Sequence, residues 1–229
     1  MTMKLQKEPR RNGKISVLVV DDHDLVRTGI KHMLEGSDTI QVLGEANTGE
    51  AAVQMTRELK PEVVLMDVKM PGIGGLEATR KLLRILPDVK VLVITVCEDD
   101  LFPSRLLQAG AAGYLTKGAS MDEMLQAIHA VSAGQRYISP NVAKQLALKH
   151  LVDDGESPFD MLSERELQVM LMITRGTKVQ DIADKLCLSP KTVNSYRYRI
   201  FEKLDVKNDV ELTHLAIRHN VLDLQRDEG

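Results

Sequence analysis

The amino-acid sequence predicts a protein of two domains: an α/β domain built on a doubly wound parallel sheet of five strands, and a smaller all-α domain of four helices. Three observations lead to this prediction. The chain has 229 residues, more than one typical domain of roughly 100 to 150 residues. Residues 14–134 alternate short β-branched apolar runs with helical patterns. From residue 162 onward only helical patterns occur.

Five strands are expected in the first domain because each run is almost continuously hydrophobic, as in strands covered on both faces. They are Ile15–Val20, Ile40–Glu45, Val63–Met66, Val91–Thr95 and Gly113–Leu115. Helices are expected between and after them, beginning at Asp24 and covering Gly49–Leu59, Gly75–Leu86, Pro103–Ala109 and Ser120–Ala133. Ser120 and Glu123 have the spacing of a capping box. The first domain is therefore assigned to residues 14–134.

The pattern loosens over residues 135–157, which we interpret as a linker. This segment contains an acidic run before Pro158 and one amphipathic helical stretch, Asn141–Leu151. The second domain is assigned to residues 158–221. Its four helical patterns are separated at Gly176, at Cys187–Pro190 and at Asp205–Asn208.

Charge is distributed unevenly. Residues 15–135 contain 11 Lys/Arg and 17 Asp/Glu, whereas residues 158–221 contain 10 and 9. The acidic first domain is a poor candidate for binding a polyanion, and positive charge gathers on Ser189–Lys203. Cys97 and Cys187 lie far apart without metal-ligand spacing, which fits a reducing compartment. No apolar run approaches the roughly 18 residues of a membrane helix, so we expect a cytoplasmic protein with no membrane partner.

Three carboxylates follow strands of the predicted sheet. Asp21 and Asp22 follow the first strand, and Asp67 follows the third. In a flavodoxin-like strand order, 2-1-3-4-5, these two strands are neighbours at the switch point, so the carboxylates should converge. Clustered carboxylates repel one another unless a cation joins them, and an oxygen-only site with room for water suits Mg²⁺.

Two further groups complete a candidate phosphoryl site. Thr95 ends the fourth strand with a hydroxyl, and Lys117 follows the fifth with an ammonium group. Together with a carboxylate nucleophile and a divalent ion they supply the positioning and charge neutralisation that phosphoryl transfer needs. Any one of these residues alone could be structural, since an Asp after a strand is a common helix cap. Their occurrence in order, each at the end of a strand, favours the functional interpretation.

The motifs Val-Leu-Val-Val-Asp21-Asp22-His23, Leu-Met-Asp67-Val-Lys-Met-Pro-Gly, Val-Ile-Thr95 and Ala-Ala-Gly-Tyr114-Leu-Thr-Lys117 resemble the CheY-like receiver domain of bacterial response regulators. The resemblance implies that a sensor histidine kinase donates a phosphoryl group to Asp67. It also implies Mg²⁺ ligands from Asp21, Asp22, Asp67 and the backbone carbonyl of Lys69. Tyr114 resembles the aromatic switch residue that turns inward when Thr95 moves toward the phosphoryl group. The alternative for Tyr114 is an ordinary core aromatic.

The second domain carries a helix-turn-helix pattern. Ser189 suits an N-cap, Pro190 the first helical turn and Ala183 a close helix crossing. Val193, Ile200 and Leu204 share an inner face at helical spacing. The other face is expected to present polar groups to solvent and then to DNA: Lys191, Thr192, Asn194, Ser195, Arg197, Tyr198 and Arg199, with Lys178 at the preceding helix. The alternative is a merely solvated polar face, but the mixture of cations with Asn, Ser and Tyr favours double-stranded DNA.

The pattern from Leu162 to Leu204 resembles the LuxR-type helix-turn-helix of the NarL/FixJ regulators, and Pro190–Leu204 is similar to the GacA/UvrY/SirA/LetA group of global regulators. The resemblance implies that this helix enters the major groove of promoter DNA and that the last helix, near Asp209–Arg218, forms a homodimer. We therefore expect a phosphorylation-controlled transcription factor, an activator of the GacA type, and not an enzyme. One alternative is an aspartyl-phosphate phosphatase, but such enzymes carry an acid two residues after the nucleophile, where this chain has Lys69. The other is a phosphorelay module without DNA output.

Overall fold

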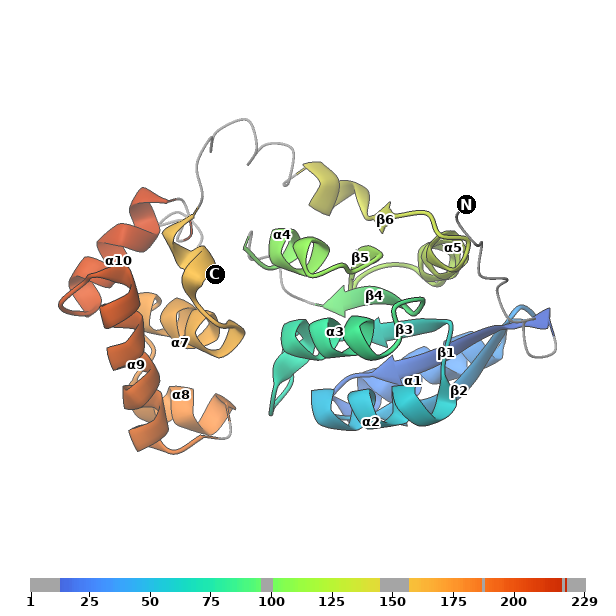
Figure 1. The fold of residues 1–229 in the computed structure, drawn as a ribbon, viewed down its shortest axis with the longest axis horizontal. Coiled ribbons are helices and arrows are strands. Elements are labelled where there is room, and N and C mark those ends of the chain that lie inside the picture. Colours follow the sequence, from blue (N-terminus) through green and yellow to red (C-terminus); the bar gives the residue numbers. More distant parts are fainter. Residues whose placement is uncertain (1–12, 96–100, 145–156, 187, 220, 222–229) are drawn as a thin grey trace, which may run out of the picture. The chain divides into compact units, whose positions relative to one another are not determined.

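A computed structural model describes residues 13–95, 101–144, 157–186, 188–219 and 221 of the chain. The chain forms two compact units (Figure 1). The first is an α/β domain that ends at Ala143, and the second contains the helices from α7 onward. Cys97, Cys187 and most of the predicted linker helix Asn141–Leu151 lie outside the described residues.

The α/β domain is built on a parallel sheet in the order β2-β1-β3-β4-β5-β6. Its strands are β1 (Ile15–Val20), β2 (Ile40–Ala46), β3 (Val63–Met66), β4 (Lys90–Thr95), β5 (Gly113–Thr116) and β6 (Tyr137–Ile138). The predicted doubly wound fold is confirmed, and the expected strands match β1 to β5 to within one residue at their ends. β1 pairs with β3 from Val17↔Val63 to Val20↔Met66, so both strands end at the same edge.

The prediction of a five-stranded sheet is wrong by one strand. β6 adds to the free edge of β5, with Tyr137 N donating to Ala112 O at 3.2 Å and Ser139 N to Tyr114 O at 3.0 Å. Two residues are too few to show the alternation or the apolar run by which a strand is recognised. The segment was therefore assigned to the linker.

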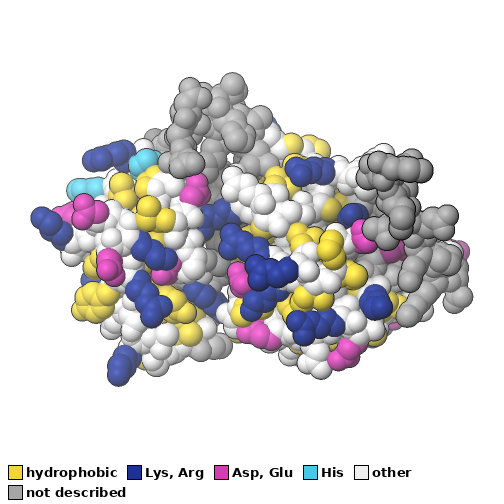
Figure 2. Space-filling view, viewed as in Figure 1, with side chains coloured by type: hydrophobic (Ala, Val, Ile, Leu, Met, Phe, Trp, Pro, Cys, Tyr) yellow, Lys and Arg dark blue, Asp and Glu magenta, His cyan; other side chains and the backbone are white. Residues whose placement is uncertain are grey.

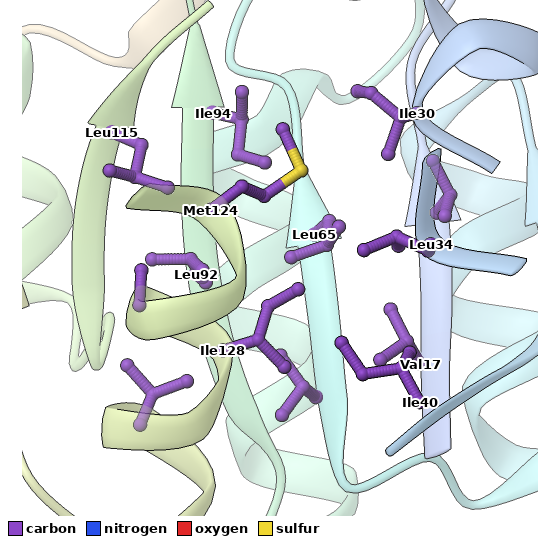
Figure 3. Packing of buried hydrophobic residues seen from close by; sticks show 14 of the residues in the cluster. Val17, Ile30, Leu34, Ile40, Leu65, Leu92, Ile94, Leu115, Met124 and Ile128 are labelled. Atoms are coloured by element: carbon purple, nitrogen blue, oxygen red, sulfur yellow. The ribbon is translucent and has the colours of Figure 1, made fainter. Parts of the chain in front are cut away.

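Helices cover both faces of the sheet: α1 (Asp24–Glu35) and α5 (Met121–Ser132) lie on one face, and α2 (Gly49–Leu59) and α3 (Gly74–Ile85) on the other (Figure 1). α4 (Leu101–Gln108) follows β4. Figure 3 shows the core between α1, α5 and the sheet, where Val17, Leu65 and Leu92 meet Leu34 and Ile128. Successive strand residues point to opposite faces, so Leu18 and Val20 pack under the other helices.

The second domain is entirely helical within the described residues. A 3₁₀ turn η2 (Pro158–Met161) leads into α7 (Glu164–Thr174), α8 (Val179–Leu186), α9 (Pro190–Leu204) and α10 (Asp209–Arg218). The four predicted helices are confirmed. Ser163 and Glu166 form a reciprocal capping box on α7, and Ser189 caps α9 by accepting a hydrogen bond from Thr192 N at 3.0 Å. Among the described residues, no helix is both long and apolar enough to span a membrane.

Candidate functional site

The predicted carboxylates converge at the edge of the sheet where β1 and β3 end. Val20 and Met66 are paired in register, and Asp67 N donates to Val20 O at 2.9 Å. The residues that follow, Asp21 and Asp67, are therefore neighbours. Their side chains are each only 2% exposed, whereas the side chain of Asp22 is 26% exposed. Burial makes their mutual repulsion costly, because little water screens it.

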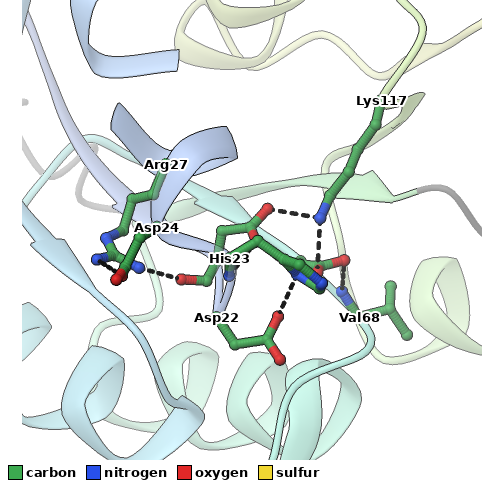
Figure 4. A network of polar contacts seen from close by, with 8 residues as sticks. Asp22, His23, Asp24, Arg27, Val68 and Lys117 are labelled. Atoms are coloured by element: carbon green, nitrogen blue, oxygen red, sulfur yellow. Dashed lines mark hydrogen bonds and ion pairs between the residues drawn. The ribbon is translucent and has the colours of Figure 1, made fainter. Parts of the chain in front are cut away.

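Lys117 bridges two of these carboxylates (Figure 4). Its Nζ lies 2.6 Å from Asp21 Oδ2 and 2.9 Å from Asp67 Oδ2. Burial alone would lower the pKa of Lys117, but the hydrogen bonds and charges of Asp21 and Asp67 outweigh it, and the pKa is raised. The ammonium group is therefore fully charged at neutral pH and neutralises one of the two negative charges that it contacts.

The negative charge of Asp67 is not fully compensated by its surroundings. Burial raises its pKa above the ordinary value and the charge of Asp21 adds to this, while Lys117 and the N–H of Val68, which donates to Oδ1 at 2.7 Å, oppose it. The net direction is upward. A buried carboxylate with a raised pKa is stabilised when a further cation binds beside it.

The cluster fits a magnesium ion. Potential ligand atoms of Asp21, Asp22, His23 and Asp67 all lie within 4.8 Å of one another. Asp22 Oδ1 is buried and accepts no hydrogen bond in the structure, although His23 Nδ1 approaches it at 2.8 Å. Carboxylate oxygens are the ligands that Mg²⁺ prefers. The partial exposure of Asp22 leaves room for the water molecules that the ion retains. His23 was not predicted as part of this group, and its side chain is 67% exposed.

Two further residues, which the sequence did not single out, hold the loops of this cluster in place. Arg27 on α1 donates through Nη1 to Asp21 O at 2.8 Å. Glu50 on α2 accepts a hydrogen bond from Ile73 N at 3.0 Å in the loop after β3. Gly72, with φ +77°, lies against the Glu50 carboxylate, where a Cβ would collide with it. These contacts join side chains to backbone groups of other loops, and no spacing pattern in the sequence predicts them.

Of the remaining predicted residues of this domain, Thr95 and Lys69 lie at the same edge of the sheet, whereas Tyr114 lies within β5. Thr95 ends β4 and is completely buried, and its carbonyl accepts a hydrogen bond from Lys117 N at 2.9 Å. Lys69 is exposed in the loop after Asp67. Tyr114 on β5 is 0% exposed, so its ring occupies the interior.

Helix α9 of the second domain has one buried apolar face and one exposed polar face. Val193, Ile200 and Leu204 are buried, as the inner face was predicted to be. Lys191, Ser195, Tyr198 and Arg199 are exposed, Tyr198 at 68%, and Asn194 and Thr192 are half-buried. Lys178 is exposed just before α8. Figure 2 shows Lys and Arg side chains on the visible face of this domain with Asp and Glu among them.

Arg197 is placed differently from the other cations. It was expected to face solvent, but its Nε and Nη2 donate to Asp209 Oδ1 and Oδ2 at 2.7 and 2.6 Å. With 3.6 residues per turn, Arg197 lies only about 40° around α9 from Val193 and about 100° from Tyr198. The angular position could have been read from the sequence, but the charge of the residue led to its assignment to the outer face.

Comparisons with known proteins agree with both halves of this description. Residues 17–129 match the response regulator receiver domain, and residues 160–216 match the luxR family of bacterial regulatory proteins. The chain is 68% identical over 209 residues to the response regulator GacA of Pseudomonas protegens, covering 91% of this chain and 98% of that protein. This protein belongs to the LuxR-type two-component response regulators. It combines a receiver domain with a DNA-binding domain and acts as a transcriptional regulator.

Other relatives of this response regulator agree. It is 57% identical over 208 residues to UvrY of Escherichia coli K12, covering 90% of this chain and 95% of that protein. A solved structure of RcsB from Salmonella enterica serovar Typhimurium, bound to the promoter P1flhDC in the presence of the phosphomimetic BeF₃⁻, has a TM-score of 0.59 at 26% identity and covers 88% of this chain and 97% of that one. The predicted family, fold and regulatory function are thereby confirmed.

Proposed function

We propose that Asp67 is the phosphoryl acceptor of this response regulator and that its phosphorylation, by a cognate sensor histidine kinase, controls binding of a homodimer to promoter DNA. The observation that carries the proposal is the shared ammonium group of Lys117 between Asp21 and Asp67. Three charged groups in contact, two negative and one positive, leave a net negative charge, which a bound metal ion would offset so that an anionic phosphoryl group can be accepted.

The transfer step follows from this arrangement. A carboxylate oxygen of Asp67 attacks the phosphorus of a phosphohistidine, the new P–O bond forms as the P–N bond breaks, and the imidazole leaves with that electron pair and takes a proton. Lys117 neutralises charge on the phosphoryl oxygens, and the hydroxyl of Thr95 is the second donor. Mg²⁺, when bound by Asp21, Asp22, Asp67 and the carbonyl of Lys69, would stabilise the charge on the equatorial oxygens.

This assignment is tested by intact-mass spectrometry of the full chain with Mg²⁺ and a small phosphodonor. The wild-type protein should gain the mass of one phosphoryl group, and Asp67→Asn should gain none. Asp24→Asn is the matched control, because Asp24 is 86% exposed and is not among the cluster's potential ligands. A phosphorylated Asp67→Asn protein would show that the acceptor lies elsewhere.

The output of the site is DNA binding through α9. We propose that Asn194, Ser195 and Tyr198 contact bases, while Lys178, Lys191, Thr192 and Arg199 contact phosphates. The exposure of Lys191, Ser195, Tyr198 and Arg199 leaves these side chains accessible to DNA, and the division follows from their chemical type. RcsB, bound to a promoter in the presence of a phosphomimetic, is a related protein in which such an output occurs. We further propose that the protein acts in the cytoplasm and is not an enzyme.

The division between base and phosphate contacts predicts two kinds of defect. Asn194→Ala should weaken the binding free energy by about 1 to 3 kcal/mol on the specific duplex only. Lys191→Ala should weaken binding to all duplexes and lower the slope of log K against log salt concentration by roughly one. Titrations of specific and unrelated duplexes at several salt concentrations measure both. An unchanged ratio of specific to nonspecific affinity in Asn194→Ala would contradict the base-reading assignment.

A further inference from the structure

An ion pair lies beside the polar face of α9, the helix proposed to contact DNA. The guanidinium of Arg197 on α9 donates two hydrogen bonds to the carboxylate of Asp209, the first residue of α10, at 2.7 and 2.6 Å. The same guanidinium lies over the ring of Phe201, 5.4 Å from its centroid. Two parallel bonds fix the orientation of the planar group as well as its position, and the ring holds it from a second side.

Asp209 is well placed to keep this cation. It stands in the first turn of α10, where the helix dipole favours a negative charge. Its backbone carbonyl accepts a hydrogen bond from Thr213 Oγ1 at 2.8 Å, within the same helix. The side chains of Arg197 and Asp209 are 29% and 43% exposed, so the pair borders solvent beside the face that carries Tyr198.

The pair has no net charge, and this decides what it can contribute to DNA binding. A protein gains salt-dependent affinity for DNA when a cation neutralises a phosphate and releases a condensed counterion. An arginine already neutralised by Asp209 releases none. If it left for a phosphate, it would also strand a carboxylate beside the DNA backbone.

We propose that Asp209 withholds Arg197 from DNA, so that Arg197 is a positioning residue that ties α9 to α10, and that removing the charge of Asp209 converts Arg197 into an additional phosphate contact. The inference rests on the proposed DNA-binding function of α9. The pairing of Arg197 with Asp209 keeps the affinity of this domain for nonspecific DNA lower than the number of its Lys and Arg residues would give. A regulator with weaker nonspecific binding spends less time on the rest of the genome.

The test uses the full-length protein and a mixed-sequence duplex, with dissociation constants measured by fluorescence anisotropy over a series of salt concentrations. Asp209→Asn should bind more tightly than wild type at low salt, and the slope of log K against log salt should steepen by about 0.9, the value for one more phosphate neutralised. Glu211→Gln is the matched control. It removes one negative charge from the same helical turn, but its carboxylate contacts Lys207 N.

The double variant Arg197→Ala/Asp209→Asn identifies the cation that is released. It should return the slope to the wild-type value, because the additional contact is then absent. A purely structural role for the pair would change thermal stability in these variants and leave the slope alone.

The inference would be overturned by equal slopes of log K against log salt for Asp209→Asn and wild type, or by equal steepening in Glu211→Gln and Asp209→Asn. It would also be overturned if the single variant Arg197→Ala reduced the magnitude of the slope by about one. Failure of the wild-type protein to bind duplex DNA at any salt concentration would instead overturn the proposed function, and the inference with it.

Discussion

Each domain buries a carboxylate beside a lysine, and the two carboxylates respond in opposite ways. Asp67 of the receiver domain is 2% exposed and contacts Lys117, and Glu166 of the DNA-binding domain is 5% exposed and contacts Lys203 at 2.6 Å. Burial pushes the pKa of both upward. For Asp67 that direction prevails, whereas for Glu166 the hydrogen bonds of Lys203 and of Ser163 N–H outweigh burial and the pKa is lowered.

Burial is the largest cause of the raised pKa of Asp67, and the partners of the two carboxylates add to the difference. Lys117 is shared with Asp21, whose charge works against Asp67, while Lys203 serves Glu166 and is helped by the capping box on α7. Glu166 is thus part of a satisfied pair that stabilises its domain. The receiver cluster keeps an excess negative charge, which costs stability and which a metal ion would offset. Such costs are common at functional sites.

The largest expected effect comes from removing the shared lysine. Lys117→Met should destabilise the receiver domain by about 3 kcal/mol in Mg²⁺-free buffer, because two buried carboxylates then lack a cation. Lys203→Met should cost only about 1 kcal/mol, since that ammonium group is 39% exposed and the capping box remains.

Hydrogen exchange of peptides from β1 and β3, and from α7 and α9, reports on the two domains separately in the full chain. Added Mg²⁺ should recover part of the loss in Lys117→Met and none in Lys203→Met. Equal losses and no effect of Mg²⁺ would contradict the contrast between the two pairs.

The strands of the receiver domain could be predicted from the sequence, whereas the contacts that distinguish Asp67 from Glu166 could not. β1 and β3 are continuous apolar runs and β4 and β5 are largely apolar. Asp21, Asp67, Thr95 and Lys117 each follow or end one of these strands, so the order of the strands brings them together. β6 has two residues and leaves no periodicity. The sharing of Lys117 depends on side-chain directions at three strand ends, which no one-dimensional pattern specifies. The ion pair of Arg197 likewise depends on a partner from another helix, Asp209 of α10, which no sequence pattern specifies.

A smaller effect is expected from pH. The pKa of Glu166 is lowered, so its stabilising contribution is complete above the unfolded value of 4.5 and is lost as pH falls through the folded pKa. The pKa of Asp67 is raised, so its contribution is complete below the unfolded value of 3.8 and is lost as pH rises through the folded pKa. Acidification through the folded pKa of Asp67, without Mg²⁺, should therefore favour the receiver domain, whereas acidification below pH 4.5 should weaken the DNA-binding domain through Glu166.

Urea titrations followed by amide signals of each domain measure this opposition. Glu166→Gln retains the cap and removes the charge, so it should flatten the acid loss of the DNA-binding domain only. An identical acid response in wild type and Glu166→Gln would show that other groups dominate.

The smallest effect tests the source of the excess charge. Asp21→Asn should lower the pKa of Asp67 and stabilise the receiver domain by about 1 kcal/mol without Mg²⁺, because it removes a buried like charge and keeps an oxygen for His23 N–H. The same variant should lose affinity for Mg²⁺ in calorimetric titrations. A destabilised receiver domain in this variant would mean that Asp21 is chiefly a structural partner of Lys117.

The central claim, that phosphorylation of Asp67 controls DNA binding, is tested most directly by titrating one duplex. The duplex carries a site recovered by sequencing the DNA bound to the phosphorylated full-length protein. With Mg²⁺ and a phosphodonor, wild type should bind this duplex on the order of tenfold more tightly or better, since a paired protein contacts two half-sites. Asp67→Asn should bind with the affinity of untreated wild type, with or without the donor. An equal gain in Asp67→Asn, or no gain in a fully phosphorylated wild-type protein, would contradict the account.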